Sequence, residues 1–162
     1  MEVLHTYKSP NFTARRGGHA TPSMIIIHYT DMKTGQEALE RLCDPASEVS
    51  AHYVIEEDGR LFQLVDDDKR AWHAGASEWQ GESDINSASI GIELVNPGHT
   101  WGYRAFPDVQ IEVLIDLCRE LMGKYDIPLN RILGHSDVAP GRKIDPGELF
   151  PWKQLRGALS SD

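Results

Sequence analysis

Residues 24–28, Met-Ile-Ile-Ile-His, place the strongest constraint on what this chain can fold into. A short, continuous and mostly β-branched run, bounded by Pro22 and a polar segment, predicts a strand buried inside a sheet. His28 follows the isoleucines directly, so we expect it to leave the sheet at the strand end, on a rigid mount suited to a metal ligand. Taken alone, a histidine beside an apolar run is more often a structural residue.

The rest of the chain alternates patterns typical of helices and strands. Apolar positions 113, 114, 117, 118, 121 and 122 form one stripe and predict an amphipathic helix over 108–125. The other expected elements are helices at 36–43 and after Pro151, a hairpin of 52–55 with 61–65, and strands at 90–95 and 131–134. This order predicts a single three-layer α/β domain, a central mixed β-sheet flanked by helices. Residues 1–22 are turn-rich and are expected to form a surface arm, with the folded domain over 23–162.

Composition excludes several classes of function. The chain has 162 residues, of which 40% are hydrophobic and 25% charged, as in an ordinary globular domain. A net charge of −9 disfavours a nucleic-acid partner or an anionic membrane surface. No obligate protein partner is evident, and no run is long enough to cross a membrane. The N-terminus lacks signal-peptide features, so we expect a cytoplasmic location, or a periplasmic one if a leader has been removed.

Gly134 to Gly147 is the segment richest in chemical groups. Its glycines and prolines are too frequent for a helix or strand and predict a surface loop of fixed shape. His135 and Asp145 offer a nitrogen and an oxygen ligand of the kind that zinc accepts. With His28 they would make the three protein ligands of a catalytic zinc that keeps one position open.

Glu93 and Lys143 are the candidate catalytic residues. Glu93 is a carboxylate inside the apolar strand 90–95, where burial is costly unless a cation, hydrogen bonds or a shared proton partners it. Facing a metal site, it would have a raised pKa and act as a general base, and Gly91 on the same face would leave room for substrate. Lys143 lies two residues before Asp145 and could stabilise an oxyanion. The alternatives are an edge-strand glutamate that points to water and a solvated loop lysine.

The remaining histidines give weaker signals. His73 follows Trp72 in a loop, where the pair could line a substrate groove, although surface packing is about equally plausible. His52 alternates into the hairpin and is equally consistent with a structural role. The others have no chemical groups near them in the sequence and are expected to be surface residues: His5, His19 and His99.

Five segments in order resemble the zinc-dependent N-acetylmuramoyl-L-alanine amidases of the type 2 family, which share a fold with phage lysozyme-amidases and peptidoglycan recognition proteins. They are Ile26-Ile27-His28-Tyr29-Thr30, Ser50-Ala51-His52-Tyr53-Val54, Ala71-Trp72-His73-Ala74-Gly75, Ser89-Ile90-Gly91-Ile92-Glu93-Leu94, and the Gly134–Gly147 run. The resemblance covers about Met24 to Trp152. It implies that the zinc ligands are His28, His135 and Asp145, the base Glu93 and the oxyanion stabiliser Lys143. Asp145 in place of cysteine implies the bacterial branch, and we expect His73, Tyr29 and Arg142 to contact substrate.

The resemblance implies hydrolysis of the amide between the lactyl group of N-acetylmuramic acid and L-alanine of peptidoglycan stem peptides, with one Zn²⁺. The expected partners are muropeptides, and the lack of leader features favours anhydro-muropeptides in cell-wall recycling. Two alternatives stay open. One is a periplasmic or secreted amidase that remodels murein, and the other is a peptidoglycan-binding module with a structural zinc.

Overall fold

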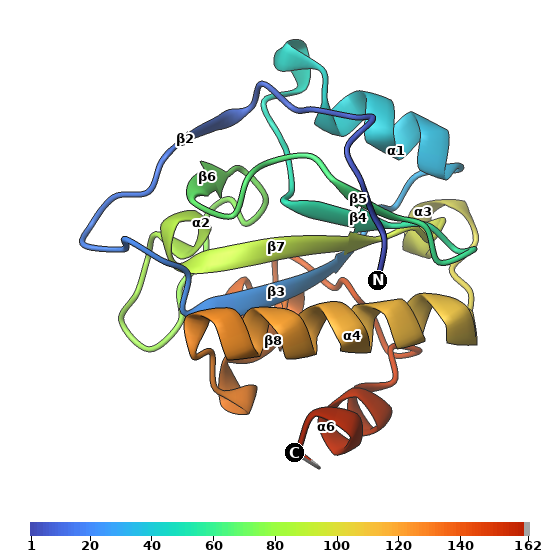
Figure 1. Ribbon diagram of the computed structural model, residues 1–162. Coiled ribbons are helices and arrows are strands. Elements are labelled where there is room, and N and C mark those ends of the chain that lie inside the picture. The colour runs from blue at the N-terminus through green and yellow to red at the C-terminus, as the bar shows by residue number, and fades with distance from the viewer. Residues whose placement is uncertain (161–162) are drawn as a thin grey trace.

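The computed structural model describes residues 1–160 and shows a six-stranded mixed sheet with helices on both faces (Figure 1). The strand order is β1-β5-β4-β7-β3-β8, in which only the β4–β5 pair is antiparallel. The strands in that order are Val3–Leu4, Leu61–Gln63, Tyr53–Ile55, Ser89–Leu94, Met24–Tyr29 and Ile132–Gly134. The three-layer α/β fold predicted from the sequence is therefore confirmed.

The run of isoleucines forms β3, which lies between β7 and β8 and is buried along its whole length. Its side chains alternate between two cores, as strand geometry requires. Ile25 and Ile27 pack in the cluster that contains the residues of α4 (Asp108–Tyr125), whereas Met24 and Ile26 pack in a cluster on the opposite face. His28 continues this second set, so its imidazole points away from α4.

Different helices cover the two faces of the sheet. The long α4 and the C-terminal α6 (Trp152–Ser160) contact each other and cover one face with the largest apolar cluster. On the other face lie α1 (Gly35–Leu42) and α2 (Ile85–Ala88), as Figure 1 shows. This second cover is split between two smaller clusters, one against α1 and one against α2. The strand ends between them are left open for a site.

Arg15 ties the N-terminal segment to the domain. Within residues 1–22, β1 pairs with β5, and β2 (Phe12–Ala14) pairs with β6 (Lys69–Ala71). The Arg15 guanidinium then donates hydrogen bonds to the backbone oxygens of Asp67, Ser87 and Ser89. A guanidinium can satisfy several carbonyls at once because its five N–H donors are held in one plane.

The loop expected over Gly134–Gly147 contains a short helix that the sequence analysis did not predict. Residues His135–Val138 form α5 directly after β8, so the expectation of no helix in this run was wrong. The Asp137 carboxylate accepts a hydrogen bond from Gly134 N at 2.8 Å and satisfies the helix start. The other unpredicted elements are short: β1, β2, β6, α2, α3 (Gly98–Trp101) and the 3₁₀ turns Pro45–Ser47 and Leu129–Arg131.

The boundary expected at residue 162 falls just outside the described part of the chain. Within residues 1–160, none of the helices is long and apolar enough to cross a membrane.

Candidate metal centre and active site

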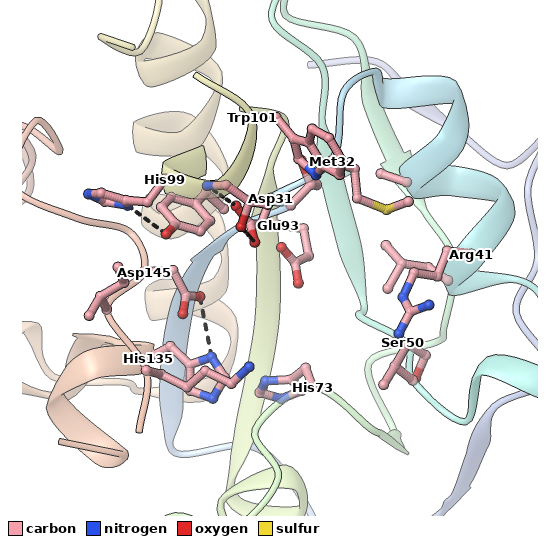
Figure 2. A pocket seen from close by; sticks show the side chains of 18 of the residues that line it. Asp31, Met32, Arg41, Ser50, His73, Glu93, His99, Trp101, His135 and Asp145 are labelled. Carbon is pink, nitrogen blue, oxygen red and sulfur yellow. Dashed lines mark hydrogen bonds and ion pairs between the residues drawn. The ribbon is translucent and has the colours of Figure 1, made fainter. Parts of the chain in front are cut away.

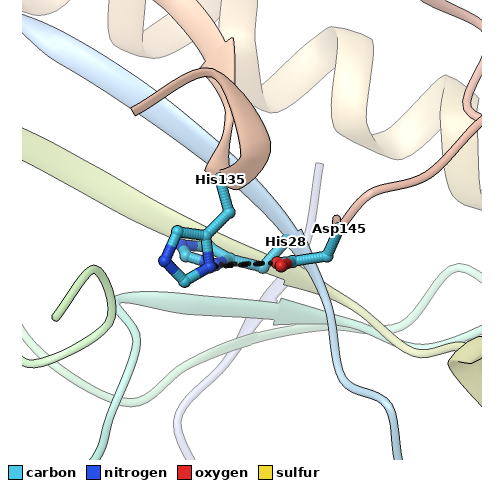
Figure 3. A group of neighbouring side chains, drawn as sticks. All are labelled: His28, His135 and Asp145. Carbon is cyan, nitrogen blue, oxygen red and sulfur yellow. Dashed lines mark hydrogen bonds and ion pairs between the residues drawn. The ribbon is translucent and has the colours of Figure 1, made fainter. Parts of the chain in front are cut away.

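Three buried side chains converge where β3 and β8 end (Figure 3). His28 is near the end of β3, His135 is the first residue of α5 after the neighbouring β8, and Asp145 lies in the loop that follows. The two Nδ1 atoms are 3.0 Å apart, and each is 3.2 Å from Asp145 Oδ2. The structure thus brings together the three residues that the sequence analysis singled out as metal ligands.

Hydrogen bonds behind the site fix which nitrogen of His135 faces the centre. Its Nε2 lies 2.9 Å from the carbonyl oxygen of Ala74, which can only accept. Nε2 therefore carries the proton, and in the neutral ring Nδ1 presents a lone pair toward His28 and Asp145. A second hydrogen bond of this type is the usual way in which proteins orient a metal-binding imidazole.

A chain of three hydrogen bonds fixes His28 in the same way. Ser89 Oγ donates to the carbonyl of Ile85 at 2.6 Å, so it accepts from His73 Nε2 at 3.1 Å. His73 Nδ1 is then unprotonated and accepts from His28 Nε2 at 2.9 Å. The remaining nitrogen of His28, Nδ1, is left with a lone pair that points at the centre. We call this series Ser89–His73–His28 the histidine relay.

The centre therefore gathers three electron-pair donors without a proton donor between them. Burial lowers the pKa of His28 to about 4, with a smaller contribution from the neighbouring His135. At neutral pH, therefore, no proton on His28 Nδ1 bridges the three donor atoms. Ligands bound at about 2.0–2.1 Å around a tetrahedral ion lie about 3.3 Å from each other. The spacings of 3.0–3.2 Å fit such an ion. The two imidazoles and the carboxylate could hold a metal ion.

Glu93 lies beside this centre on the adjacent strand. In the parallel pair of β3 and β7, Glu93 is in register with His28. Both side chains extend from the face of the sheet that α4 does not cover. Its Oε2 atom is buried and has no hydrogen-bond partner among residues 1–160. Burial, helped by the nearby Asp145 charge and opposed by Lys143, raises the pKa of Glu93 well above its usual value. Glu93 as a whole is half-buried, and a carboxylate with one buried, unpartnered oxygen and a raised pKa is suited to proton transfer.

His73, Glu93, His135 and Asp145 line one cavity of about 600 Å³ (Figure 2). Lys143 is exposed on its rim, on the same loop as Asp145. The wall beside α1 is largely apolar and includes Leu42, Val49 and Trp72. The cavity thus combines a buried polar centre with an open arm in which an extended ligand could lie.

The residues expected to contact substrate all line the cavity, but their polar atoms already have partners. Both ring nitrogens of His73 are used in the histidine relay. The Tyr29 hydroxyl lies 2.7 Å from His99 Nδ1, and the Arg142 guanidinium donates to the carbonyls of Ala74 and Ala76. Their contacts support positioning roles, and substrate contact by them stays a prediction.

Gly91 has a different purpose from the one expected. A Cβ atom at Gly91 would lie 2.4 Å from the ring of His73. The space above this glycine is therefore filled by the His73 ring, and the expectation that it leaves room for substrate was wrong. Glycine is needed because the ring must approach the β7 backbone closely to reach His28.

The family model described as N-acetylmuramoyl-L-alanine amidase matches residues 18–148, most of the chain and all of the candidate site. The chain belongs to this amidase family. It is similar to the N-acetylmuramoyl-L-alanine amidase AmiD of Escherichia coli, with 38% identity over 88% of the chain, and spans 56% of the length of that relative. It is 34% identical to the 1,6-anhydro-N-acetylmuramyl-L-alanine amidase AmpD of Escherichia coli, over 95% of the chain and 91% of that relative.

Solved structures of the amidase family agree with the fold. A crystal structure of an AmpD derivative superposes with a TM-score of 0.83 at 31% identity, covering 98% of this chain and 93% of the other. The E. coli AmiD structure gives a TM-score of 0.77 at 34% identity, with 91% and 65% coverage. That AmiD structure is a complex with the substrate anhydro-N-acetylmuramic acid-L-Ala-D-γ-Glu-L-Lys.

Sequence reasoning missed two features of this amidase site. His99, expected to have no neighbours of note, stacks on Tyr103 with ring centroids 4.1 Å apart and contacts Tyr29 and Glu148. His99 is exposed, as expected, but α3 brings it to the cavity, and no local sequence pattern predicts so short a helix. His52 is structural: its Nδ1 accepts from Gly91 N at 3.0 Å and its Nε2 lies 2.8 Å from the Lys69 carbonyl.

The second missed feature is the wall of the cavity beside α1 and α3. Arg41 and Trp101 both line it, yet each stands alone in the sequence with no neighbouring motif. Only the packing of α1 and α3 around the open strand ends brings these side chains to the cavity. An arginine in the last turn of a helix is ordinary, so no signal in the sequence distinguishes Arg41.

Proposed function

We propose that this chain is a zinc-dependent amidase that cleaves the bond between the lactyl group of N-acetylmuramic acid and L-alanine of stem peptides. The observation that carries the proposal is the convergence of two imidazole lone pairs and a carboxylate beside the unpartnered Oε2 of Glu93. The zinc ligands in this proposal are His28, His135 and Asp145. Two nitrogens and one oxygen make a donor set typical of catalytic zinc, which keeps a further position open.

Zinc in this position would supply Lewis acidity, which makes a water molecule acidic near neutral pH and polarises a carbonyl group. Glu93 would take the proton from the attacking water, since its pKa is raised by burial toward the range of a useful base. It would then return that proton to the departing alanine nitrogen. Lys143, on the rim of the cavity, would stabilise the negative charge that develops on the carbonyl oxygen.

We further propose that the substrate is an anhydro-muropeptide and that the enzyme acts in cell-wall recycling in the cytoplasm. The similarity to AmpD over nearly its whole length supports this choice, because that relative is named for 1,6-anhydro-N-acetylmuramyl-L-alanine. The negative net charge supports it too, since it suits a small diffusible fragment better than a large anionic polymer.

The test is metal analysis paired with product identification. The purified protein should contain one zinc per chain and should release the stem peptide from a 1,6-anhydro-muropeptide, with loss of activity on chelation. Turnover on intact murein sacculi is measured alongside. Strong activity on sacculi would favour a murein-remodelling enzyme over the recycling role, and binding without release of peptide would favour a recognition module with a structural zinc.

A further inference from the structure

Arg41 stands out among the arginines of the chain. Within residues 1–160 its side chain forms no hydrogen bond, ion pair or ring contact. Every other arginine has at least one such partner, and these are Arg15, Arg16, Arg60, Arg70, Arg104, Arg119, Arg131, Arg142 and Arg156. An unpaired guanidinium is a strong donor of bidentate hydrogen bonds, so its surroundings decide what it can bind.

The position of Arg41 places this free cation on the wall of the active-site cavity, where the residue is exposed. The residue is in the last turn of α1 and lines the cavity. Figure 2 shows its guanidinium beside Ser50, on the wall opposite His135 and Asp145, with Glu93 between the two walls. Ser50 Oγ is already occupied by the Asn11 carbonyl and the Trp72 amide, so it does not compete for the guanidinium.

The other cations of the cavity are committed elsewhere. Arg142 donates to the carbonyls of Ala74 and Ala76, and Lys143 is the proposed oxyanion stabiliser on the loop that carries Asp145. The acidic groups nearest the centre, Glu93 and Asp145, would repel a second carboxylate placed beside them. An anionic group of the substrate is therefore best received at the opposite wall, by Arg41.

We infer that Arg41 binds the free α-carboxylate of a γ-linked glutamate at the second position of the stem peptide. This rests on the proposed function. The ligand in the AmiD complex has the order L-Ala-D-γ-Glu-L-Lys, and a γ-linkage leaves the α-carboxylate of that glutamate uncombined. This carboxylate follows the scissile amide by about two residue lengths, roughly 7 Å. Arg41, His135 and Asp145 line the same cavity of about 600 Å³, so one ligand can reach both walls.

The subsite gives the enzyme a means of choosing between stem peptides. A planar guanidinium matches both oxygens of a carboxylate, whereas a carboxamide offers one acceptor and turns an N–H toward the cation. Amidation of this carboxylate should therefore weaken the interaction selectively.

The experiment compares two substrates and two variants. The substrates are anhydromuramyl-L-Ala-D-γ-Glu-L-Lys and the same molecule with the glutamate α-carboxylate converted to a carboxamide. The wild type should prefer the carboxylate in kcat/KM by about tenfold or more, as expected for a hydrogen bond between charged groups. Arg41→Met should lose this preference through a higher KM for the carboxylate form, with kcat, zinc content and Tm unchanged.

Arg60→Met is the matched control. It removes the same charge from an exposed arginine that pairs with Asp58 in the hairpin turn, away from the cavity. It should keep the wild-type preference, which separates a local contact from a general effect of net charge. A third substrate, amidated only at the peptide C-terminus, should behave like the unmodified peptide in all three proteins.

The outcomes are distinguishable. Equal losses on both substrates in Arg41→Met, no loss on either, or dependence on the C-terminal carboxylate would each overturn the assignment of Arg41 while leaving the amidase function intact. If the wild type cleaves neither substrate, the proposed function itself fails.

Discussion

Glu93 on β7 lies directly across from His28 on β3, in a parallel pair whose other members are almost all apolar. The register fixes both polar side chains at the same height on the same face of the sheet. A shift of one residue would send one of them into the core beneath α4. The proposed base and one proposed metal ligand are therefore positioned by strand pairing, which is more rigid than a loop.

The role of Glu93 as the base can be tested by Glu93→Gln. The amide keeps the shape of the side chain but cannot accept a proton at neutral pH. We expect kcat to fall by at least about 10²-fold, in line with general-base catalysis, while bound zinc and the circular dichroism spectrum stay unchanged. Activity within a few-fold of the wild type would remove Glu93 from the mechanism.

The histidine relay predicts that His73 controls metal affinity without binding the metal. His73→Phe removes the acceptor for His28 Nε2, so the ring of His28 is no longer held in one tautomer. Zinc affinity, measured by competition with a chromophoric chelator, should fall by about 10–100-fold.

His73→Gln is the matched variant for this relay. Its amide can accept from His28 and donate to Ser89, so it should recover much of the lost affinity. If the phenylalanine and glutamine variants bind zinc equally, His73 serves packing alone. ¹⁵N chemical shifts of the His28 ring report the tautomer directly.

Gly91→Ala should displace the His73 ring that packs against the β7 backbone. The added Cβ would lie 2.4 Å from the His73 ring, so the ring or the strand must move. We expect a loss of about 1–3 kcal/mol in the free energy of unfolding, as for other overpacking substitutions. Combining Gly91→Ala with His73→Ala removes the clash, so the two losses should sum to more than the loss in the double variant. Simple additivity in urea titrations would contradict the clash.

His52 makes stability depend on pH. Its Nδ1 accepts from Gly91 N, so protonation would place two N–H groups against each other. Burial lowers the pKa of His52 to about 4, from an unfolded value of about 6.5. Between these two values the unfolded chain binds more protons, so the free energy of unfolding falls as pH drops from about 6.5 to about 4, by on the order of 3 kcal/mol, and then levels off.

The comparison variant for this effect is His52→Gln, which does not titrate. It should be less stable than the wild type at pH 7, and the difference between the two proteins should narrow by that amount at pH 4. Urea denaturation at a series of pH values measures this. Parallel curves for the two proteins would show that His52 is not the titrating group.

The long elements could be predicted from the sequence because each carries its own periodic pattern. Three apolar patterns can be read directly: the isoleucines of β3, the strand that contains Glu93, and the apolar stripe of α4. The α/β fold follows because these apolar surfaces must be buried against one another. The candidate ligand set His28, His135 and Asp145 was predicted from types of side chain at strand and loop positions, and the structure brings the three residues together. Its convergence rests on the neighbouring placement of β3 and β8.

What the sequence did not reveal depends on contacts between distant segments. The relay partner of His28 is His73, 45 positions away, and its need for Gly91 arises only when a loop folds over β7. The helix α5 was hidden because four residues are too few for a periodic signal. His99 and Arg41 reach the cavity through helix placement, which no spacing in the chain encodes.

The metal centre joins two parts of the chain that are far apart in sequence. His28 is 107 positions from His135 and 117 from Asp145. An ion held by all three would act as a reversible cross-link, closing a loop that spans about two-thirds of the polypeptide and reducing the entropy gained on unfolding. Supply of the metal would then set the resistance of the protein to proteolysis as well as its activity, so that a cell short of zinc would lose both together.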